Sequence, residues 1–293
     1  MDTHTPHTPD TPDTPGASPL RPSEGAALAA WARLVDADRE QVECLREPAP
    51  GADFYAPVAA AFRPGQRESL EWPLIAEHAR PEDTWLDIGA GGGRIAVPLA
   101  GVVERVVAVE PSEAMRSTLA SAASEAGRTN IEVVDASWPV AGWTQDADVT
   151  LAAHCLYDIG EPAAFLDAME RHTRHTCLAL FGCWARGAHL ARLFEAVHDE
   201  PMATLPSLRE FVALLGSRGR RYEVRTVDGG DAGTPRPAEE AYAVPRRLLW
   251  LAEGSEKDGR MRRLVDEWYG GPDGVTLPAM RPWIGLVAWA PPR

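Results

Sequence analysis

Apolar residues recur at helical spacing through the first part of the chain, beginning at Ser23. The segment "SEGAALAAWARLVDADREQVECLRE" offers Ser23 as an N-cap and Glu24 in the first turn. Two shorter stretches of the same period, "ADFYAPVAAAFR" and "QRESLEWPLIAEHAR", follow before Pro81. The pattern predicts an N-terminal helical cap segment over residues 23–80.

From residue 81 the pattern changes to short apolar runs that alternate with amphipathic segments. The runs are rich in β-branched residues, which is typical of a parallel sheet covered on both faces. The predicted strands span residues 84–89, 105–110, 131–135, 147–153 and 176–183. The predicted helices between them span residues 92–102, 112–127 and 161–172. Alternation of this kind predicts a doubly wound α/β domain.

This alternation breaks past Trp184. The later segments are helices at 188–199 and 207–217, a strand "YEVRTVDG", helices near 238–254 and 258–269, and a last strand "WIGLVAWAP". We therefore expect one Rossmann-like domain over residues 81–293, with helical insertions near 188–218 and 237–270. Together with the N-terminal helices, these insertions are expected to form a lid over the ends of the sheet.

Composition and charge narrow the possible partners. Residues 1–22 are a Thr-Pro-Asp repeat with almost nothing to bury, which predicts a disordered tail. The formal net charge of −14 and the short basic clusters make nucleic acid or an anionic membrane surface an unsuitable partner. We expect a small-molecule partner instead; the sequence indicates no oligomeric state.

Four cysteines and the lack of long apolar runs indicate the compartment. The cysteines form no CxxC pair, so reduced thiols in a cytosol fit them best. No apolar run approaches the roughly 20 residues of a membrane span, and the N-terminus lacks the order of a signal peptide. We therefore expect a cytoplasmic protein. No spacing typical of a metal site appears, and we expect no metal.

The stretch "LDIGAGGGRIAVPLA" joins a predicted strand to a predicted helix through four glycines. Such a turn directs several backbone N–H groups and a helix N-terminus at one point, which suits a ligand with negative charge or many acceptor atoms. A dinucleotide fits the GxGxxG/A register Gly91, Gly93 and Ala96, with Glu110 near the expected distance. The earlier register, from Gly89, places Arg94 where a small residue must pack.

The same stretch has the form D-x-G-x-G-x-G at Asp87, Gly89, Gly91 and Gly93. On these residues the chain resembles the class I S-adenosylmethionine-dependent methyltransferases, most strongly over residues 50–185. The resemblance implies a mostly parallel seven-stranded sheet and S-adenosylmethionine as the cofactor. A carboxylate beside the sulfonium and ammonium of this donor is electrostatically favourable, whereas beside a pyrophosphate it would repel.

The resemblance extends to the ends of the next strands. Glu110 in "VVAVEPS" matches the acid that accepts hydrogen bonds from both ribose hydroxyls, and a vicinal diol has two such donors. Asp135 in "IEVVDAS" matches the position that contacts the adenine amino group, with Ala136 beside it. The implied cofactor-binding residues are Asp87, Gly89, Ala90, Gly91, Gly93, Glu110, Pro111, Asp135, Ala136 and His154.

Candidate catalytic residues follow the fourth strand, in "AAHCLYDI". Methyl transfer requires the acceptor to be held in line with the methyl group, and a base only where the acceptor loses a proton early. His154 is the candidate base, and Tyr157 and Asp158 are candidates to position the acceptor. His154 has a structural alternative as a core histidine, and Asp158 has one as a helix cap.

Two aromatic residues are candidates for the acceptor pocket. Tyr55 lies in the N-terminal segment, and Trp184 follows the fifth strand. We expect methyl transfer to a small molecule, at oxygen before nitrogen or carbon. The alternatives are an NAD(P)-dependent oxidoreductase that uses the Gly91 register, and a protein that binds S-adenosylmethionine without catalysis.

Overall fold

The computed structural model describes residues 23–49, 53–65, 69–185, 187–229, 234–280 and 282–292. The tail for which the sequence predicts disorder, residues 1–22, lies outside the described residues. Within the described part, no helix is both long enough and apolar enough to cross a membrane.

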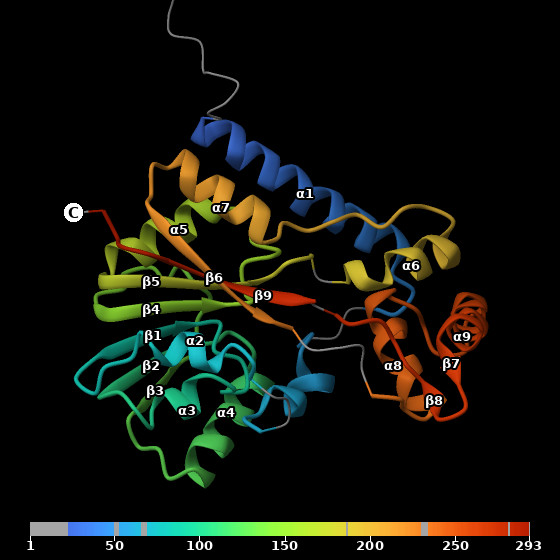
Figure 1. Ribbon diagram of the computed structural model, residues 1–293, viewed down its shortest axis with the longest axis horizontal. Coiled ribbons are helices and arrows are strands. Elements are labelled where there is room, and N and C mark those ends of the chain that lie inside the picture. The colour runs from blue at the N-terminus through green and yellow to red at the C-terminus, as the bar shows by residue number, and fades with distance from the viewer. Residues whose placement is uncertain are drawn as a thin grey trace, which may run out of the picture.

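A seven-stranded sheet with the order β3-β2-β1-β4-β5-β9-β6 forms the centre of the fold (Figure 1). Its strands are β1 (Thr84–Ile88), β2 (Arg105–Val109), β3 (Ile131–Val134), β4 (Ala147–Ala153), β5 (Thr173–Gly182), β6 (Tyr222–Asp228) and β9 (Trp283–Trp289). The first five pair in parallel, and β9 runs antiparallel to both β5 and β6. The predicted doubly wound, mostly parallel seven-stranded sheet is confirmed. Strand order reverses between β1 and β4, where such sheets bind ligands at their carboxyl edge.

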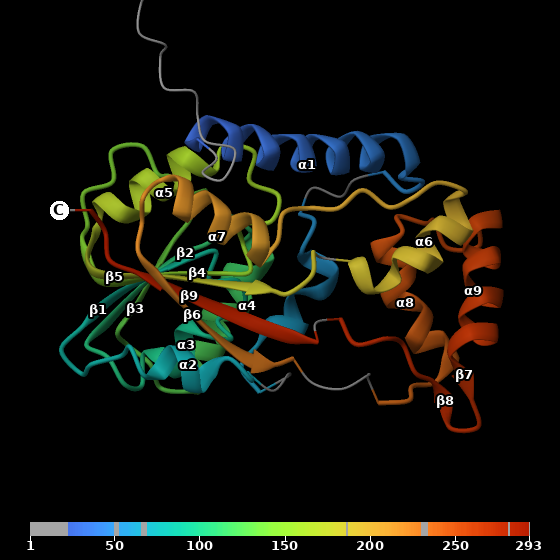
Figure 2. The ribbon, with the colours of Figure 1, turned by 45° about the horizontal axis from the view of Figure 1, so that its top comes forward.

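Helices cover both faces of the sheet, as Figure 2 shows. One face is covered by α1 (Glu24–Leu45), α5 (Pro162–Arg171) and α7 (Leu208–Ser217). The other face is covered by α2 (Trp72–Ala76), α3 (Ala96–Leu99) and α4 (Glu113–Glu125). The central strands β1, β2, β4, β5 and β9 are therefore mostly buried on both sides, which explains their continuous apolar runs.

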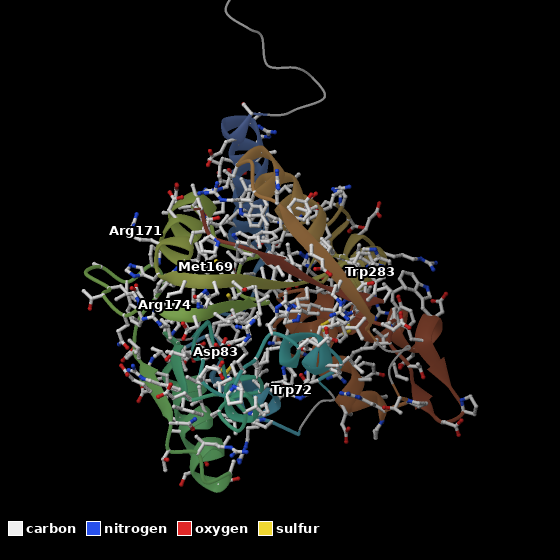
Figure 3. The ribbon with its side chains drawn as sticks, turned by 60° about the vertical axis from the view of Figure 1, so that its left-hand side comes forward. Trp72, Asp83, Met169, Arg171, Arg174 and Trp283 are labelled. Carbon is white, nitrogen blue, oxygen red and sulfur yellow. The ribbon has the colours of Figure 1, made fainter. Side chains whose placement is uncertain are left out.

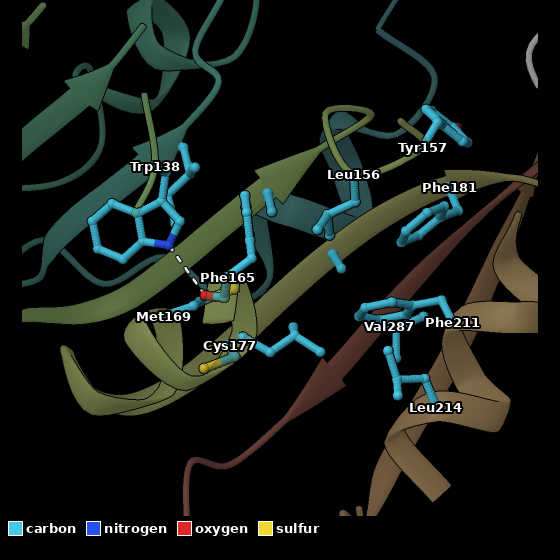
Figure 4. Close-up of a cluster of buried hydrophobic side chains, with 14 of the residues drawn as sticks. Trp138, Leu156, Tyr157, Phe165, Met169, Cys177, Phe181, Phe211, Leu214 and Val287 are labelled. Atoms are coloured by element: carbon cyan, nitrogen blue, oxygen red, sulfur yellow. Dashed lines mark hydrogen bonds between the residues drawn. The ribbon is translucent and has the colours of Figure 1, made fainter. Parts of the chain in front are cut away.

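Aromatic side chains fill the core under α1, α5 and α7 (Figure 4). The rings of Phe181 on β5 and Phe211 on α7 lie 4.7 Å apart between centroids. Trp138 donates its indole N–H to the carbonyl oxygen of Phe165 at 3.2 Å. Trp31 of α1 packs edge-on against Phe181 and donates to the Ile159 carbonyl at 2.8 Å. Helix α1 is thus anchored directly beside the loop that follows β4.

The predicted helical boundaries hold at some points and fail at others: the helix predicted near 238–254 ends at Leu248. Ser23 caps α1 as expected, accepting from the Ala26 N–H at 3.3 Å. The helix predicted for 92–102 is only Ala96–Leu99, with Ile95 as its N-cap. The glycine run takes up the residues before it, since Gly89 and Gly93 have φ of 71° and 85°, outside the right-handed helical region.

The later helices build a separate small core. It joins η2 (Ala188–Leu190), α6 (Ala191–His198), α8 (Ala238–Leu248), α9 (Glu256–Tyr269) and the hairpin of β7 (Gly270–Gly271) and β8 (Gly274–Val275). We call these elements the small subdomain. Figures 1 and 2 place it beyond the edge of the sheet where β4 and β5 end. Glu47, after α1, accepts from the Ala252 N–H at 2.7 Å and so joins the two parts.

The opposite edge of the sheet, where the parallel strands begin, is occupied by structural polar contacts. Asp148 accepts from the Thr84 N–H at 2.9 Å and from Arg174 Nη1 at 3.2 Å. Figure 3 shows Asp83 and Arg174 on this side and Trp283 on the other. A search for a site therefore starts at the carboxyl edge of the strands.

Candidate functional site

A cavity of about 440 Å³ lies at the carboxyl edge, where β1, β2 and β4 end. Most of the residues singled out in the sequence meet there. The predicted residues that line it are Tyr55, Asp87, Gly89, Ala90, Gly91, Glu110, Pro111, His154, Tyr157 and Asp158. The predicted residues outside its lining are Gly93, Asp135, Ala136 and Trp184. Its size is within the range of small-molecule sites, roughly 300–1,000 Å³.

The glycine loop borders the cavity and packs closely against neighbouring segments. A Cβ atom on Gly89 would lie 2.7 Å from Cys155 Cβ, and one on Gly92 would lie 2.9 Å from the Phe62 carbonyl oxygen. Gly91 has φ of 56°, which L side chains rarely adopt. The glycines therefore serve close packing on both sides of the loop as well as access to a ligand. Gly93 has the packing role, because its position faces Val97 and Leu119.

Glu110 is held at the end of β2 by the loop itself. Its Oε2 accepts from the Gly91 N–H at 2.8 Å, and its Oε1 accepts from the Ser112 N–H at 2.9 Å. The side chain is buried, and burial raises its pKa. Each carboxylate oxygen can accept a second hydrogen bond, so this orientation suits a ligand with two adjacent donors.

Asp87 is the most unusual acid of the site. It is 1% exposed, and its Oδ2 has no hydrogen-bond partner among the described residues. Burial raises the pKa of Asp87 to about 7, the charge of Glu110 adds to this, and Arg94 opposes it. A buried carboxylate oxygen without a partner is costly, and a bound cationic donor would remove that cost.

Arg94 provides positive charge to the lining and forms an ion pair with Glu71. It also donates to Ser69 Oγ at 3.2 Å. Glu71 is 2% exposed and lines the same cavity. The sequence did not indicate Glu71 as a site residue. No local pattern marks it, because the contact spans 23 positions.

A segment that we call the strap, residues 53–63, runs along α4 and covers part of the cavity. It contains η1 (Ala56–Phe62). Tyr55, Ala61 and Phe62 of the strap line the cavity. Asp53 at its start accepts from Ser112 Oγ at 2.8 Å and from the Ala114 N–H at 3.1 Å, which caps α4.

At its other end, Arg63 pairs with Glu125, the last residue of α4. The strap is therefore fastened to both ends of one helix. Sequence reasoning found Tyr55 but missed Asp53. Its partners on α4 are about 60 positions away, so no sequence spacing could reveal the contact.

His154 and Tyr157 form a connected pair at the end of β4. His154 Nδ1 lies 3.0 Å from the Tyr157 hydroxyl, which also accepts from the Gly182 N–H at 2.8 Å. His154 has φ of 58°, a left-handed conformation that costs of order 1–3 kcal/mol in a non-glycine residue. Such strain is concentrated at functional sites. Asp158, next along the chain, is exposed and lines the cavity as well.

The remaining predicted residues lie away from the cavity. Asp135 is exposed and forms an ion pair with Arg116 at 2.8 Å. Ala136 packs against the core. Trp184 is 50% exposed. Arg116 also donates to the Pro111 carbonyl at 2.6 Å, so Asp135 remains joined to the end of β2 through one side chain.

The segment that builds most of this cavity matches a known protein family. Residues 86–181 match a family model described as a methyltransferase domain. These residues form a methyltransferase domain. The matched range begins one residue before Asp87 and ends within β5, so it contains the glycine loop, Glu110 and the His154–Tyr157 pair. This match favours a methyl-donor site over a dinucleotide site at the glycine loop.

Solved structures share the fold of this methyltransferase at low identity. YcgJ from Bacillus subtilis is 15% identical, with a TM-score of 0.52 over 77% of this chain and 99% of that chain. YjhP from Escherichia coli is 14% identical, with a TM-score of 0.52 over 81% of this chain and 100% of that chain. None of the curated proteins searched matches the sequence. The likeness establishes the architecture of the methyltransferase and leaves its acceptor open.

Proposed function

We propose that this methyltransferase transfers a methyl group from S-adenosylmethionine to an oxygen atom of a small molecule. The observation that carries the choice of donor is the pairing of Asp87 and Glu110 in one cavity. One carboxylate is buried with an oxygen that lacks a partner, and the other is oriented by two backbone N–H groups. The first carboxylate, Asp87, suits an ammonium group, and the second, Glu110, suits the two hydroxyls of a ribose.

The chain's own residues fit the donor. S-adenosylmethionine, when bound, supplies a methyl group activated by a positively charged sulfur. Asp87 would accept from the ammonium group, which would end its isolation. Glu110 would accept from the ribose hydroxyls through the second lone pair of each oxygen. Pro111 and Met115, which line the cavity beyond Glu110, would contact the adenine.

Arg94 supports the same orientation of the donor. The described acids that line the cavity are Glu71, Asp87, Glu110 and Asp158. A methionyl carboxylate in these surroundings requires a cation, and Arg94 has several donors in a fork that suits a carboxylate. Arg94 would contact that carboxylate while it remains beside Glu71.

Asp135 and Ala136 are proposed for the adenine amino group. Asp135 now pairs with Arg116 at an exposed position, so its side chain would have to change partner. The Ala136 N–H already donates to the Val134 carbonyl at 3.1 Å. Support for these two residues is weaker than for Glu110, because neither lines the cavity.

The acceptor is proposed to enter beside His154, Tyr157 and Asp158. These residues line the cavity after β4, and Tyr55 of the strap lines it too. Apolar side chains such as Ile159 and Ile284 complete the walls, so the acceptor atom would be held away from water. Trp184 is a less suited acceptor contact because it does not line the cavity.

The strap and the small subdomain are proposed as the lid. The strap lies directly on the glycine loop, at Gly92. Gly229 and Met280 line the cavity and lie on two of the connections between the sheet and the small subdomain, β6 to α8 and β8 to β9. A shift of the small subdomain would therefore alter the mouth of the cavity. We also propose a cytoplasmic location, which the four free cysteines favour.

Calorimetric titration with S-adenosylhomocysteine tests the donor site, and mass spectrometry of candidate acceptors after incubation with the donor tests transfer. A product heavier by one methyl group, with the methyl on oxygen, is expected. Methyl on nitrogen or carbon would contradict the choice of oxygen. Intact nucleoside binding without transfer to any acceptor in a cell extract, and no effect of changing His154 or Asp158 there, would favour a non-catalytic binding protein.

A further inference from the structure

The Tyr157 hydroxyl joins the ends of two strands at the acceptor side of the cavity. It lies 3.0 Å from His154 Nδ1, after β4, and 2.8 Å from the backbone nitrogen of Gly182, at the end of β5. Tyr157 is 4% exposed, and its ring packs edge-on against Phe181 at 5.2 Å. The position of the hydroxyl is thus determined by the core rather than by the ligand.

The chemistry of the three groups determines the direction of the hydrogen bonds. A backbone N–H can only donate, so the Gly182 N–H donates to the Tyr157 oxygen. The phenol oxygen uses one acceptor position for the Gly182 N–H, and its single proton can then be donated to His154 Nδ1, 3.0 Å away, if that nitrogen carries no proton. In a chain from Gly182 through Tyr157 to His154 Nδ1, each donor meets an acceptor.

We propose that Tyr157 is a positioning residue that fixes His154 with its proton on Nε2, so that His154 meets the methyl acceptor as a hydrogen-bond donor. The inference rests on the proposed function only in placing the acceptor beside His154. In a neutral imidazole, one nitrogen carries the proton and the other accepts, and the bond at Nδ1 selects which. The His154 ring lies parallel to that of Tyr157, with centroids 6.2 Å apart, which is consistent with this contact.

This assignment changes the role expected of His154 from its sequence position alone. A histidine with its proton on Nε2 cannot remove a proton at that atom. It instead orients a lone pair on the acceptor. In the transfer, the acceptor oxygen forms the new bond to the methyl carbon, the bond from that carbon to sulfur breaks, and its electron pair stays on sulfur. An acceptor oxygen without a proton, such as that of a carboxylate, completes this step with no base.

Long-range proton–nitrogen NMR on protein labelled with ¹⁵N-histidine tests the assignment without any acceptor. The chain has eight histidines, and loss of one signal set in His154→Gln identifies His154. At a pH about two units above the ordinary histidine pKa of about 6.5, we expect Nδ1 without a proton and Nε2 with one. Tyr157→Phe should move the His154 Nδ1 signal towards a mixture of the two tautomers.

Tyr222→Phe is the matched control, because it removes an exposed phenol on β6 and should leave His154 unchanged. A proton on Nδ1 of His154 in the unaltered protein would overturn the proposal, as would an unchanged His154 pattern in a folded Tyr157→Phe variant. The unaltered protein alone decides the case if that variant does not fold. Failure of S-adenosylhomocysteine to bind would refute the proposed function and leave the tautomer result standing.

Discussion

Asp87 and Glu110 lie at the carboxyl ends of the neighbouring parallel strands β1 and β2, and both carboxylates line one cavity. Burial raises the pKa of Asp87 to about 7, and the negative charge of Glu110 acts in the same direction. Burial raises the pKa of Glu110 as well, although its backbone hydrogen bonds oppose that rise. The negative charges of these two buried carboxylates therefore oppose each other, and a cationic ligand would reduce that repulsion.

This pair predicts that S-adenosylhomocysteine binds more tightly as pH rises through about 7. The ammonium group of the ligand favours ionised Asp87, whose pKa of about 7 means that a proton must leave at lower pH. Binding near pH 7 should therefore release protons. Calorimetry in buffers of different ionisation enthalpy measures the release, and Asp87→Asn should abolish it. Equal affinity at pH values of about 6 and 8 would refute the contact.

The raised pKa of Asp87 affects the stability of the free protein in the opposite direction: stability falls as pH rises, whereas ligand affinity increases. The pKa of Asp87 is about 7 in the folded chain and near 3.8 in the unfolded chain, so the folded chain binds more protons between these values. Stability of the free protein should fall as pH rises from about 4 to about 7. Asp87→Asn should flatten this dependence in denaturant titrations. The unaltered slope in that variant would show that another group is responsible.

Glu110→Gln should weaken the binding of S-adenosylhomocysteine by roughly 1–3 kcal/mol, which is the cost of losing charge-assisted hydrogen bonds to a buried partner. The loop contacts of Gly91 and Ser112 rest on the same carboxylate, so the loop should loosen as well. Glu104→Gln, at the opposite edge of the sheet, is the control and should leave affinity unchanged. Unchanged affinity in Glu110→Gln would show that the ribose assignment is wrong.

Arg94→Ala should reduce affinity for S-adenosylhomocysteine by about 10-fold to 100-fold, equivalent to roughly 1.5–3 kcal/mol for a hydrogen bond to a charged group. Affinity for methylthioadenosine, which has no methionyl carboxylate, should not change. Arg105→Ala removes an exposed arginine that pairs with Glu132, and it provides the control. An equal loss of affinity for both ligands would mean that Arg94 acts only by neutralising the charge of Glu71.

Asp53→Asn should raise the dissociation rate of S-adenosylhomocysteine several-fold. The affinity should fall by a smaller factor than the dissociation rate rises. Asp53 fastens the strap to α4 through Ser112 and the Ala114 N–H, and the strap covers the glycine loop. Opening the strap should therefore speed entry as well as exit. Stopped-flow tryptophan fluorescence measures both rates. A change in affinity with unaltered rates of release would assign Asp53 to the binding surface instead.

The sheet and the donor end of the site could be predicted because their signals are local. Strand, glycine turn and helix follow one another within "TWLDIGAGGGRIAVPLA", and Glu110 ends the next apolar run. Parallel strands bring such ends to one edge, so spacing along the chain becomes proximity in space. The helix from 92 to 102 was predicted too long because glycines with positive φ delay its start to Ala96.

Contacts between distant segments could not be predicted. Glu71 meets Arg94, and Asp53 meets Ser112, only after the N-terminal segments fold back over the sheet. The same holds for Tyr157, whose contact with the Gly182 N–H spans two strands. Asp135 was assigned by its place after β3, yet its partner is Arg116 and it lies outside the cavity lining. The ion pair with Arg116 thus sets the direction of the Asp135 side chain, and its place after β3 does not.

Calorimetric titration of the purified protein with S-adenosylhomocysteine, with NADH titrated in parallel, tests the central claim most directly. The account predicts saturable binding of one nucleoside per chain well below millimolar concentration, weakened by Glu110→Gln and by Asp87→Asn, and no binding of NADH. Absence of S-adenosylhomocysteine binding at millimolar ligand, or preference for NADH, would contradict it.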